Sequence, residues 1–128
     1  PADGADGVIK SVVETVEQAG SNPCPPVVIG VGIGGNFETA PLAAKEALLV
    51  PYGERHPVSA YAQMEERILR EVNRLGIGPA GIGGTVTALD AHIVTRPTHI
   101  AGMPVAVNLC CHALRHARGR IDGRAENE

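Results

Sequence analysis

Three cysteines and four of the five histidines are the residues of this chain best suited to bind a metal or to react. Two cysteines are adjacent in VAVNLCCHALRHA at residues 105–117, and the third lies in SNPCPP at 21–26. Thiolates and imidazoles are zinc ligands, and His112 and His116 have the i,i+4 spacing with which one helix can hold one ion. The candidate ligands are therefore Cys24, Cys110, Cys111, His92, His99, His112 and His116.

The adjacent thiols of Cys110 and Cys111 are not expected to work as a pair. They end an apolar run with strand character, and successive side chains of a strand point to opposite faces of the sheet. A disulfide between neighbouring residues would also require strained geometry. The two side chains should therefore point in opposite directions if the extended geometry persists.

A glycine-rich stretch, GVGIGG at residues 30–35, offers a second possible chemistry. Its glycines have the spacing G-x-G-x-x-G after a strand, which in dinucleotide-binding proteins lets the backbone approach a pyrophosphate. Glycines of this kind also serve tight turns and close packing. A second glycine-rich loop, GIGPAGIGG at 76–84, could expose backbone amides to an anion or could serve only the turn.

Composition limits the classes of protein to which the chain can belong. It has 128 residues, the usual length of one domain, and we expect residues 1–128 to form one. A net charge of -3 without a basic patch argues against nucleic acid, and no apolar run is long enough for a membrane span. An odd number of cysteines indicates a reducing compartment, so we expect a cytoplasmic protein.

The elements that would position these residues can be predicted from periodicity. The expected fold class is α/β, a single mixed sheet flanked by helices, in the order helix, strand, helix, helix, strand, strand, helix. We expect Asp6 to cap the first helix and Gly20 to end it, Asn36 or Thr39 to cap the second, and Ser59 to cap the third. The predicted apolar face of the second helix consists of Leu42, Ala43, Leu48 and Leu49. The predicted helices are 7–19, 39–49, 59–75 and one from 112; the strands are 27–35, 85–95 and 103–109; residues 119–128 are expected to be a frayed tail.

Three separate stretches, in the same order, resemble the alpha region of the iron-sulfur hydro-lyases. They are NPCPPVVIGVGIGGNFETAPLAAKEALL at 22–49, GIGPAGIGGTVTALDAHI at 76–93 and PTHIAGMPVAVNLCCHALRHA at 97–117. This family contains the class I fumarate hydratases and the L(+)-tartrate dehydratases. The similarity extends over nearly all of residues 3–117.

The resemblance implies a [4Fe-4S] cluster held by three cysteines, with one iron left open to bind the substrate's carboxylate and hydroxyl. The family's C-P-P cysteine corresponds to Cys24 and its later cysteine ligand to Cys111, whereas Cys110 takes a position where relatives need no thiol. The family's histidine twelve residues before that ligand corresponds to His99, which is implied to act beside the substrate. The implied reaction is reversible hydration or dehydration of a dicarboxylic acid, with fumarate hydrated to L-malate or L-tartrate dehydrated to oxaloacetate.

The resemblance also implies that the chain is the C-terminal part of an alpha region. The family's third cluster cysteine and its catalytic base belong upstream of Pro1, so the chain alone is expected to be inactive. A beta subunit or beta domain is the implied partner, in an oligomer. Two alternatives stay open from the residues themselves: a nucleotide-binding module that uses GVGIGG, and a zinc-stabilised structural domain that uses the cysteines and histidines.

Overall fold

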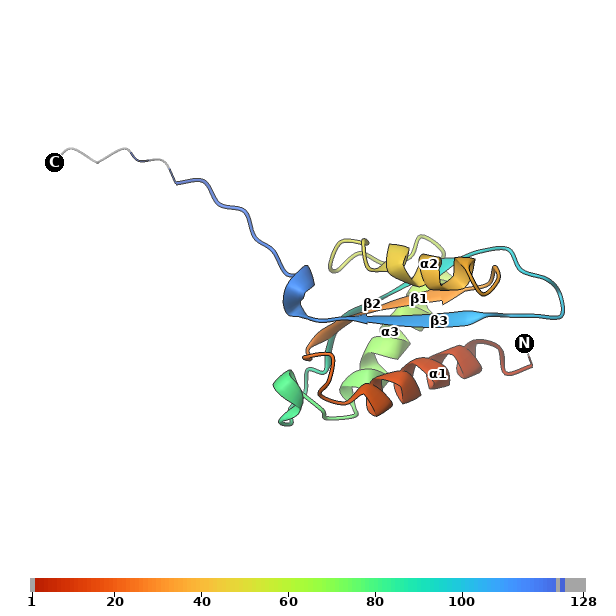
Figure 1. Ribbon diagram of the computed structural model, residues 1–128, viewed down its shortest axis with the longest axis horizontal. Helices are drawn as coiled ribbons and strands as arrows, with labels where there is room; N and C mark the ends of the chain where they lie inside the picture. The colour runs from red at the N-terminus through yellow and green to blue at the C-terminus, as the bar shows by residue number, and fades with distance from the viewer. Residues whose placement is uncertain (1, 122, 124–128) are drawn as a thin grey trace.

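A computed structural model describes residues 2–121 and 123 of the chain. Three helices and three strands occur in the predicted order up to the end of the last strand (Figure 1). Among the described residues, no helix has both the length and the apolar character that crossing a membrane requires. The elements are α1 (Gly4–Ala19), β1 (Val27–Ile33), α2 (Thr39–Ala47), α3 (Ser59–Asn73), the 3-10 helix η1 (Pro79–Gly81), β2 (Ala88–Thr95), β3 (Val105–Cys110) and the 3-10 helix η2 (His112–Leu114).

The sheet is mixed, as expected, with the strand order β2-β1-β3. β1 and β2 are parallel, and β3 returns antiparallel to β1, so that Val28 pairs with Cys110 and Ile33 with Val105. The residues just before β1 and just after β3 therefore lie at one end of the sheet. The β2–β3 loop lies at the other end.

Helices cover both faces of the sheet (Figure 1). On one face, α1 and α3 pack over Ile29, Val31 and the other buried apolar residues of the core, which are all aliphatic. On the other face, α2 packs closely over β1. Buried residues of the helical core side include Val8, Val12, Val16, Ile68 and Val72.

The observed starts of α1 and α3 differ from the predicted ones. α1 begins at Gly4, before the predicted cap, and Asp6 lies in its first turn, where its carboxylate accepts a hydrogen bond from Arg67 of α3 at 2.6 Å. Gly20 ends the helix with a φ of +54°, as predicted. Ser59 is the first residue of α3 rather than its cap.

The apolar face predicted for α2 is only partly correct. The Asn36 carboxamide oxygen accepts hydrogen bonds from the amides of Glu38 and Thr39 at the start of α2, but the capping position is Glu38, which makes no side-chain cap hydrogen bond. Ala43 is buried against the sheet, but Leu42 is 55% and Leu49 79% exposed. Small residues form the buried face because α2 lies directly against the glycines of β1.

The helix predicted from residue 112 is wrong. Within the described residues the chain after β3 forms only the three-residue η2 and then an irregular stretch. Residues 119–121 and 123 of the predicted tail have no regular structure, and residues 122 and 124–128 lie outside the described residues.

Candidate functional site

Cys24 and Cys111 lie at the same end of the sheet although 87 positions of sequence, from 24 to 111, separate them. Cys24 precedes β1 by three residues, and Cys111 directly follows β3. Since Val28 pairs with Cys110, the antiparallel register brings both thiols to this end. We call it the cysteine end.

Cys24 stands in a turn with an uncommon backbone conformation. Its φ is +54°, in the left-handed region that residues other than glycine seldom adopt. Its amide donates to the carbonyl of Ser21 at 3.1 Å, and the thiol is exposed. A strained, exposed thiol of this kind is a candidate for function, since such conformations persist where the surroundings require them.

Cys110 and Cys111 have different surroundings, because only Cys110 lies within β3. Val105, Val107 and Leu109 pack against the core shared with α1 and α3, so Cys110, one position out of phase, lies on the α2 face. Cys111 leaves the strand and caps η2, where its sulfur accepts a hydrogen bond from the Ala113 amide at 3.4 Å. Both are free thiols of intermediate exposure.

The second glycine loop, residues 76–84, also lies at the cysteine end. The Ala80 amide donates to the carbonyl of Pro25, the residue after Cys24, at 2.8 Å. A Cβ on Gly81 would come within 2.3 Å of the Cβ of Ser21, so glycine is required for this contact. The loop is therefore packed against the turn that presents Cys24.

A hollow of about 830 Å³ opens on the α2 face of the sheet, next to the segment that follows Cys111. Its floor includes Val28 of β1 and two buried residues of β2, and the segment after Cys111 contributes basic residues to its wall. The lining is mostly apolar with a few convergent polar groups, as is typical of small-molecule sites. Its polar lining residues are Tyr52, Asp90, His92, Arg115 and His116.

His99 is not brought to the cysteines. It lies in the exposed loop between β2 and β3, at the opposite end of the sheet, where its Nδ1 accepts a hydrogen bond from the Ala101 amide at 3.1 Å. β3 alone holds the two ends about 17 Å apart. Figure 1 shows this loop on the right and η2 on the left.

The glycines of GVGIGG serve packing in this fold. Gly30 and Gly32 lie inside β1, and a Cβ at either would come within 2.1 Å of a carbonyl oxygen of α2, that of Ala44 or Ala40. Gly34 and Gly35 have positive φ and hydrogen-bond to Pro104 and Pro97 at the His99 end. The space that a pyrophosphate would need above the first two glycines is filled by α2.

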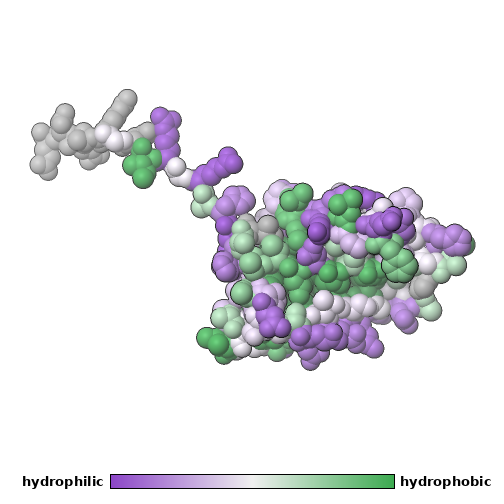
Figure 2. Space-filling view, in the orientation of Figure 1, coloured by the Kyte–Doolittle hydropathy of each residue, from purple (hydrophilic) through white to green (hydrophobic). Residues whose placement is uncertain are grey.

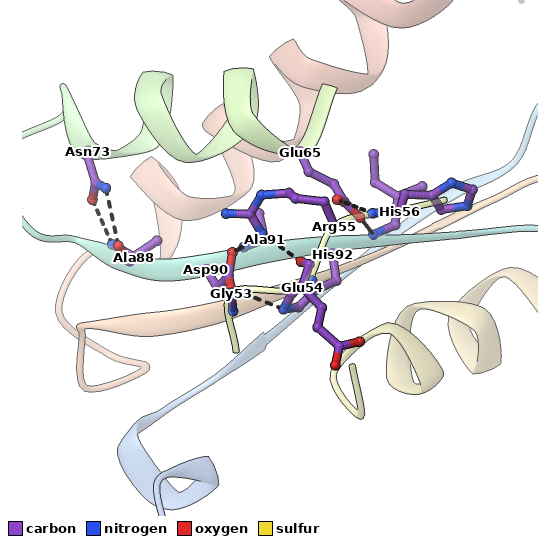
Figure 3. A network of polar contacts seen from close by, with 11 residues as sticks. Gly53, Glu54, Arg55, His56, Glu65, Asn73, Ala88, Asp90, Ala91 and His92 are labelled. Atoms are coloured by element: carbon purple, nitrogen blue, oxygen red, sulfur yellow. Dashed lines mark hydrogen bonds and ion pairs between the residues drawn. The ribbon is translucent and has the colours of Figure 1, made fainter. Parts of the chain in front are cut away.

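A network of buried charges, which periodicity did not predict, joins β2 to α3 and to the loop at 50–57 (Figure 3). Asp90 accepts hydrogen bonds from the Gly53 amide and from Arg55, both at 2.7 Å. Glu65 of α3 accepts from the amides of His56 and Ile93, both at 2.9 Å. Both carboxylates are nearly inaccessible, at 1% and 2% exposure.

His92 lies next to this network. Its Nε2 is 3.4 Å from Asp90, and among the described residues neither ring nitrogen has a hydrogen-bond partner. A signal for the network was present in the sequence, because Glu65 interrupts an apolar helical stripe and Asp90 an apolar strand. A charge at a buried position needs partners of this kind.

Among residues 2–121 and 123, no three or more Cys, His, Asp or Glu side chains are grouped closely enough to hold a metal ion. The helix that would have aligned His112 and His116 is replaced by η2 and irregular chain. The described part of the chain therefore offers no closed zinc site of its own.

Comparisons with known proteins agree on one family. The model of the family described as fumarate hydratase (Fumerase) matches residues 1–120. A protein of Methanocaldococcus jannaschii named "Putative L(+)-tartrate dehydratase subunit alpha" is 46% identical over 121 residues, which cover 94% of this chain and 42% of that protein. L(+)-tartrate dehydratase subunit alpha of Escherichia coli UTI89 is 40% identical over 126 residues, 98% of this chain and 41% of its own length. The same subunit of E. coli K12 is 40% identical over 121 residues, 94% of this chain and 39% of its own length.

The chain thus spans about two-fifths of the length of the curated relatives that it matches. More than half of each relative has no counterpart among these 128 residues. A site built from the whole subunit would therefore be represented here only in part.

Proposed function

We propose that this chain, which belongs to the fumarate hydratase (Fumerase) family, forms part of a hydro-lyase that adds water to, or removes it from, a dicarboxylic acid. The observation that carries the proposal is the family match over residues 1–120, which includes both ends of the sheet. The names of the relatives support the same class of reaction. Fumarate and L-tartrate are the two substrates that we would test.

The cysteine end is the proposed cofactor site. Cys24 and Cys111 are free thiols at one end of the sheet, and the amide already directed at the Cys111 sulfur suits a thiolate ligand. These donors fit two of the three protein ligands of a [4Fe-4S] cluster, with a third cysteine from another part of the alpha subunit. When bound, such a cluster would supply an open iron that acts as a Lewis acid toward the substrate.

The chain's own residues would bind and orient the anionic substrate around this end. The segment that follows Cys111 places Arg115 at the wall of the hollow, where a guanidinium can pair with a carboxylate. The loop at 76–84 keeps the Cys24 turn in place through the Ala80–Pro25 hydrogen bond. His99 is the residue proposed to act beside the substrate. Because it lies at the opposite end of the sheet from the cysteines, another chain or segment must bring His99 and the substrate together.

The proposed partner is a beta subunit or beta domain, because the relatives are named as alpha subunits. The proposed location is the cytoplasm. An exposed thiol such as that of Cys24 stays reduced in that compartment.

Anaerobic reconstitution tests the proposal. An alpha subunit that contains this chain would be combined with its beta partner, loaded with ferrous iron and sulfide, and assayed with fumarate and with L-tartrate. We expect a brown protein that converts at least one of them. Cys24→Ala and Cys111→Ala should lose both the colour and the activity.

Cys110→Ala is the matched control, because it removes the neighbouring thiol, which lies within β3 and is not a proposed ligand. It should keep the iron content, colour and activity of the unaltered protein. Loss of the cluster in Cys110→Ala but not in Cys111→Ala would contradict the assignment of ligands. A colourless, inactive complex in the unaltered protein would contradict the proposed cofactor.

A further inference from the structure

The hollow on the α2 face is larger than a four-carbon dicarboxylate needs, and most of its lining is apolar. Its volume of about 830 Å³ lies within the usual range for sites of drug-sized molecules. Leu48, Val50 and Leu89 are among the apolar residues that line it. Figure 2 shows apolar residues over α2 and the loop that follows it, with hydrophilic residues among them. A four-carbon dicarboxylate has no apolar part with which to cover such a lining.

His92 lines the floor of the hollow and lacks the hydrogen bonds that a buried imidazole needs. Its side chain is 1% exposed, and among the described residues neither ring nitrogen has a hydrogen-bond partner. Buried polar groups are normally hydrogen-bonded, so an exception of this kind requires an explanation. A ligand in the hollow would supply the missing partner.

The surroundings of His92 indicate which kind of group it would accept. Its Nε2 lies 3.4 Å from a carboxylate oxygen of Asp90, although the contact is not aligned as a hydrogen bond (Figure 3). That carboxylate is held in place by the Gly53 amide and by Arg55. A neutral imidazole has one N–H and one acceptor nitrogen. With the proton on Nε2, toward Asp90, the Nδ1 atom is left to accept a hydrogen bond from a hydroxyl or N–H of a ligand.

Two further polar side chains line the hollow without a partner among residues 2–121 and 123. They are Tyr52, whose side chain is exposed, and Arg115, which belongs to the segment that follows Cys111. Neither the Tyr52 hydroxyl nor the Arg115 guanidinium has a hydrogen bond or an ion pair with the described part of the chain. A guanidinium of this kind is complementary to a carboxylate. The hollow therefore presents a cation at its wall, an acceptor at its floor and apolar surface between them.

We propose that the hollow binds an organic acid that has an apolar body and a hydrogen-bond donor, and that is larger than a four-carbon dicarboxylate. The carboxylate would pair with Arg115, the body would lie against the apolar lining, and the donor would reach His92. Charge complementarity at the wall and the missing partner at the floor favour a ligand with both groups over a purely apolar cover.

This site has a consequence for the proposed reaction, in a step that rests on the proposed function. Arg115 is also the residue proposed to pair with a carboxylate of the substrate. An acid bound in the hollow would therefore compete with the substrate for Arg115 and raise its apparent KM while leaving kcat unchanged. The hollow would be a site at which a second organic acid restrains the hydro-lyase.

Calorimetric titration of the assembled alpha–beta complex with three acids tests the site. Para-hydroxyphenylpropionate has the carboxylate, the apolar ring and the donor; phenylpropionate lacks only the donor, and propionate also lacks the ring. We expect the first acid to bind about threefold to tenfold more tightly than the second, and propionate not to bind measurably. Equal affinity of the two aromatic acids would overturn the role given to His92. A complex that binds neither would overturn the site, and is the result expected if another part of the subunit fills the hollow.

Substitutions at the floor and at the wall separate the two contacts. His92→Leu keeps a side chain of similar size but removes the acceptor, so it should bind the two aromatic acids equally well. Arg115→Gln should weaken the binding of both by about tenfold or more. Arg118→Gln is the matched control, because this exposed arginine does not line the hollow, and it should bind as the unaltered complex does. If His92→Leu does not fold, the two arginine variants decide, and equal binding by them would overturn the proposal.

The titrations need neither a cluster nor turnover, so their failure is distinguishable from failure of the proposed function. In an active complex, para-hydroxyphenylpropionate should raise the KM for the substrate at concentrations that fill the hollow. An unchanged KM with the acid bound would overturn the competition at Arg115.

Discussion

The Glu65 carboxylate of α3 accepts a hydrogen bond from the backbone amide of Ile93 at 2.9 Å, and so closes the edge of β2 with a helix side chain. Its second oxygen accepts from the His56 amide, at the end of the loop that follows α2. One buried side chain thus satisfies two amides from two different segments. The cost of burying its charge is offset only while both amides are in place.

Replacement of Glu65 should therefore destabilise the chain strongly. Glu65→Leu fills a similar volume but leaves the Ile93 and His56 amides without acceptors, and we expect a loss of about 2–5 kcal/mol in the free energy of unfolding. Urea denaturation followed by circular dichroism measures this. Glu66→Leu, at the exposed neighbouring position, should change stability by about 0.5 kcal/mol or less. Equal effects at the two positions would contradict the role given to Glu65.

Asp90 has a different role, which is to hold the loop at 50–57 over the sheet. Asp90→Asn keeps the shape of the side chain but removes its charge, and so weakens the contacts with Gly53 and Arg55. We expect a loss of about 2–4 kcal/mol and faster hydrogen exchange at the Gly53 amide. Glu54→Gln, an exposed change in the same loop, should leave that exchange rate as it was. Unchanged protection of Gly53 in Asp90→Asn would show that the loop is held by other contacts.

Much of the fold followed from local pattern, because periodicity reports which face of an element is buried. It placed α1, α3 and all three strands. It failed at α2, where Leu42 and Leu49 are exposed, because close contact with Gly30 and Gly32 selects alanines for the buried face. The periodicity of the α2 sequence does not show which of its residues will lie against the glycines of β1.

The types of residue that form the candidate site could be predicted from the sequence, but their arrangement in space could not. Cys24 and Cys111 share one end because of the antiparallel register, which no spacing in the sequence fixes. The same register places His99 at the opposite end. The last predicted helix also failed, since the described chain is irregular after η2, where Ala113, Arg115 and His116 border the hollow.

His99 gives a prediction that separates binding of the cluster from conversion of the substrate. In the reconstituted alpha–beta complex, His99→Asn should keep the iron content and colour, because His99 is remote from the cysteine end of its own chain. If it acts beside the substrate, kcat/KM should fall by about a hundredfold, the usual contribution of a group that moves a proton. Ile100→Ala, at the next and 95% exposed position of the loop, is the control and should keep full activity. Full activity in His99→Asn would remove His99 from the reaction.

Gly32 tests whether the GVGIGG pattern serves packing or ligand binding. A Cβ at this position would come within 2.1 Å of the Ala40 carbonyl oxygen and 2.7 Å of the Ala44 amide nitrogen, so Gly32→Ala must push α2 off the sheet. We expect a loss of about 3 kcal/mol or more in the free energy of unfolding, at the upper end of the range for overpacked cores. Gly102→Ala is the matched control, because a Cβ there meets nothing within 4 Å, and it should be close to neutral. A loss of stability in Gly32→Ala but not in Gly102→Ala assigns these glycines to the contact between β1 and α2. A stable Gly32→Ala variant that had lost affinity for a dinucleotide would instead assign them to ligand binding.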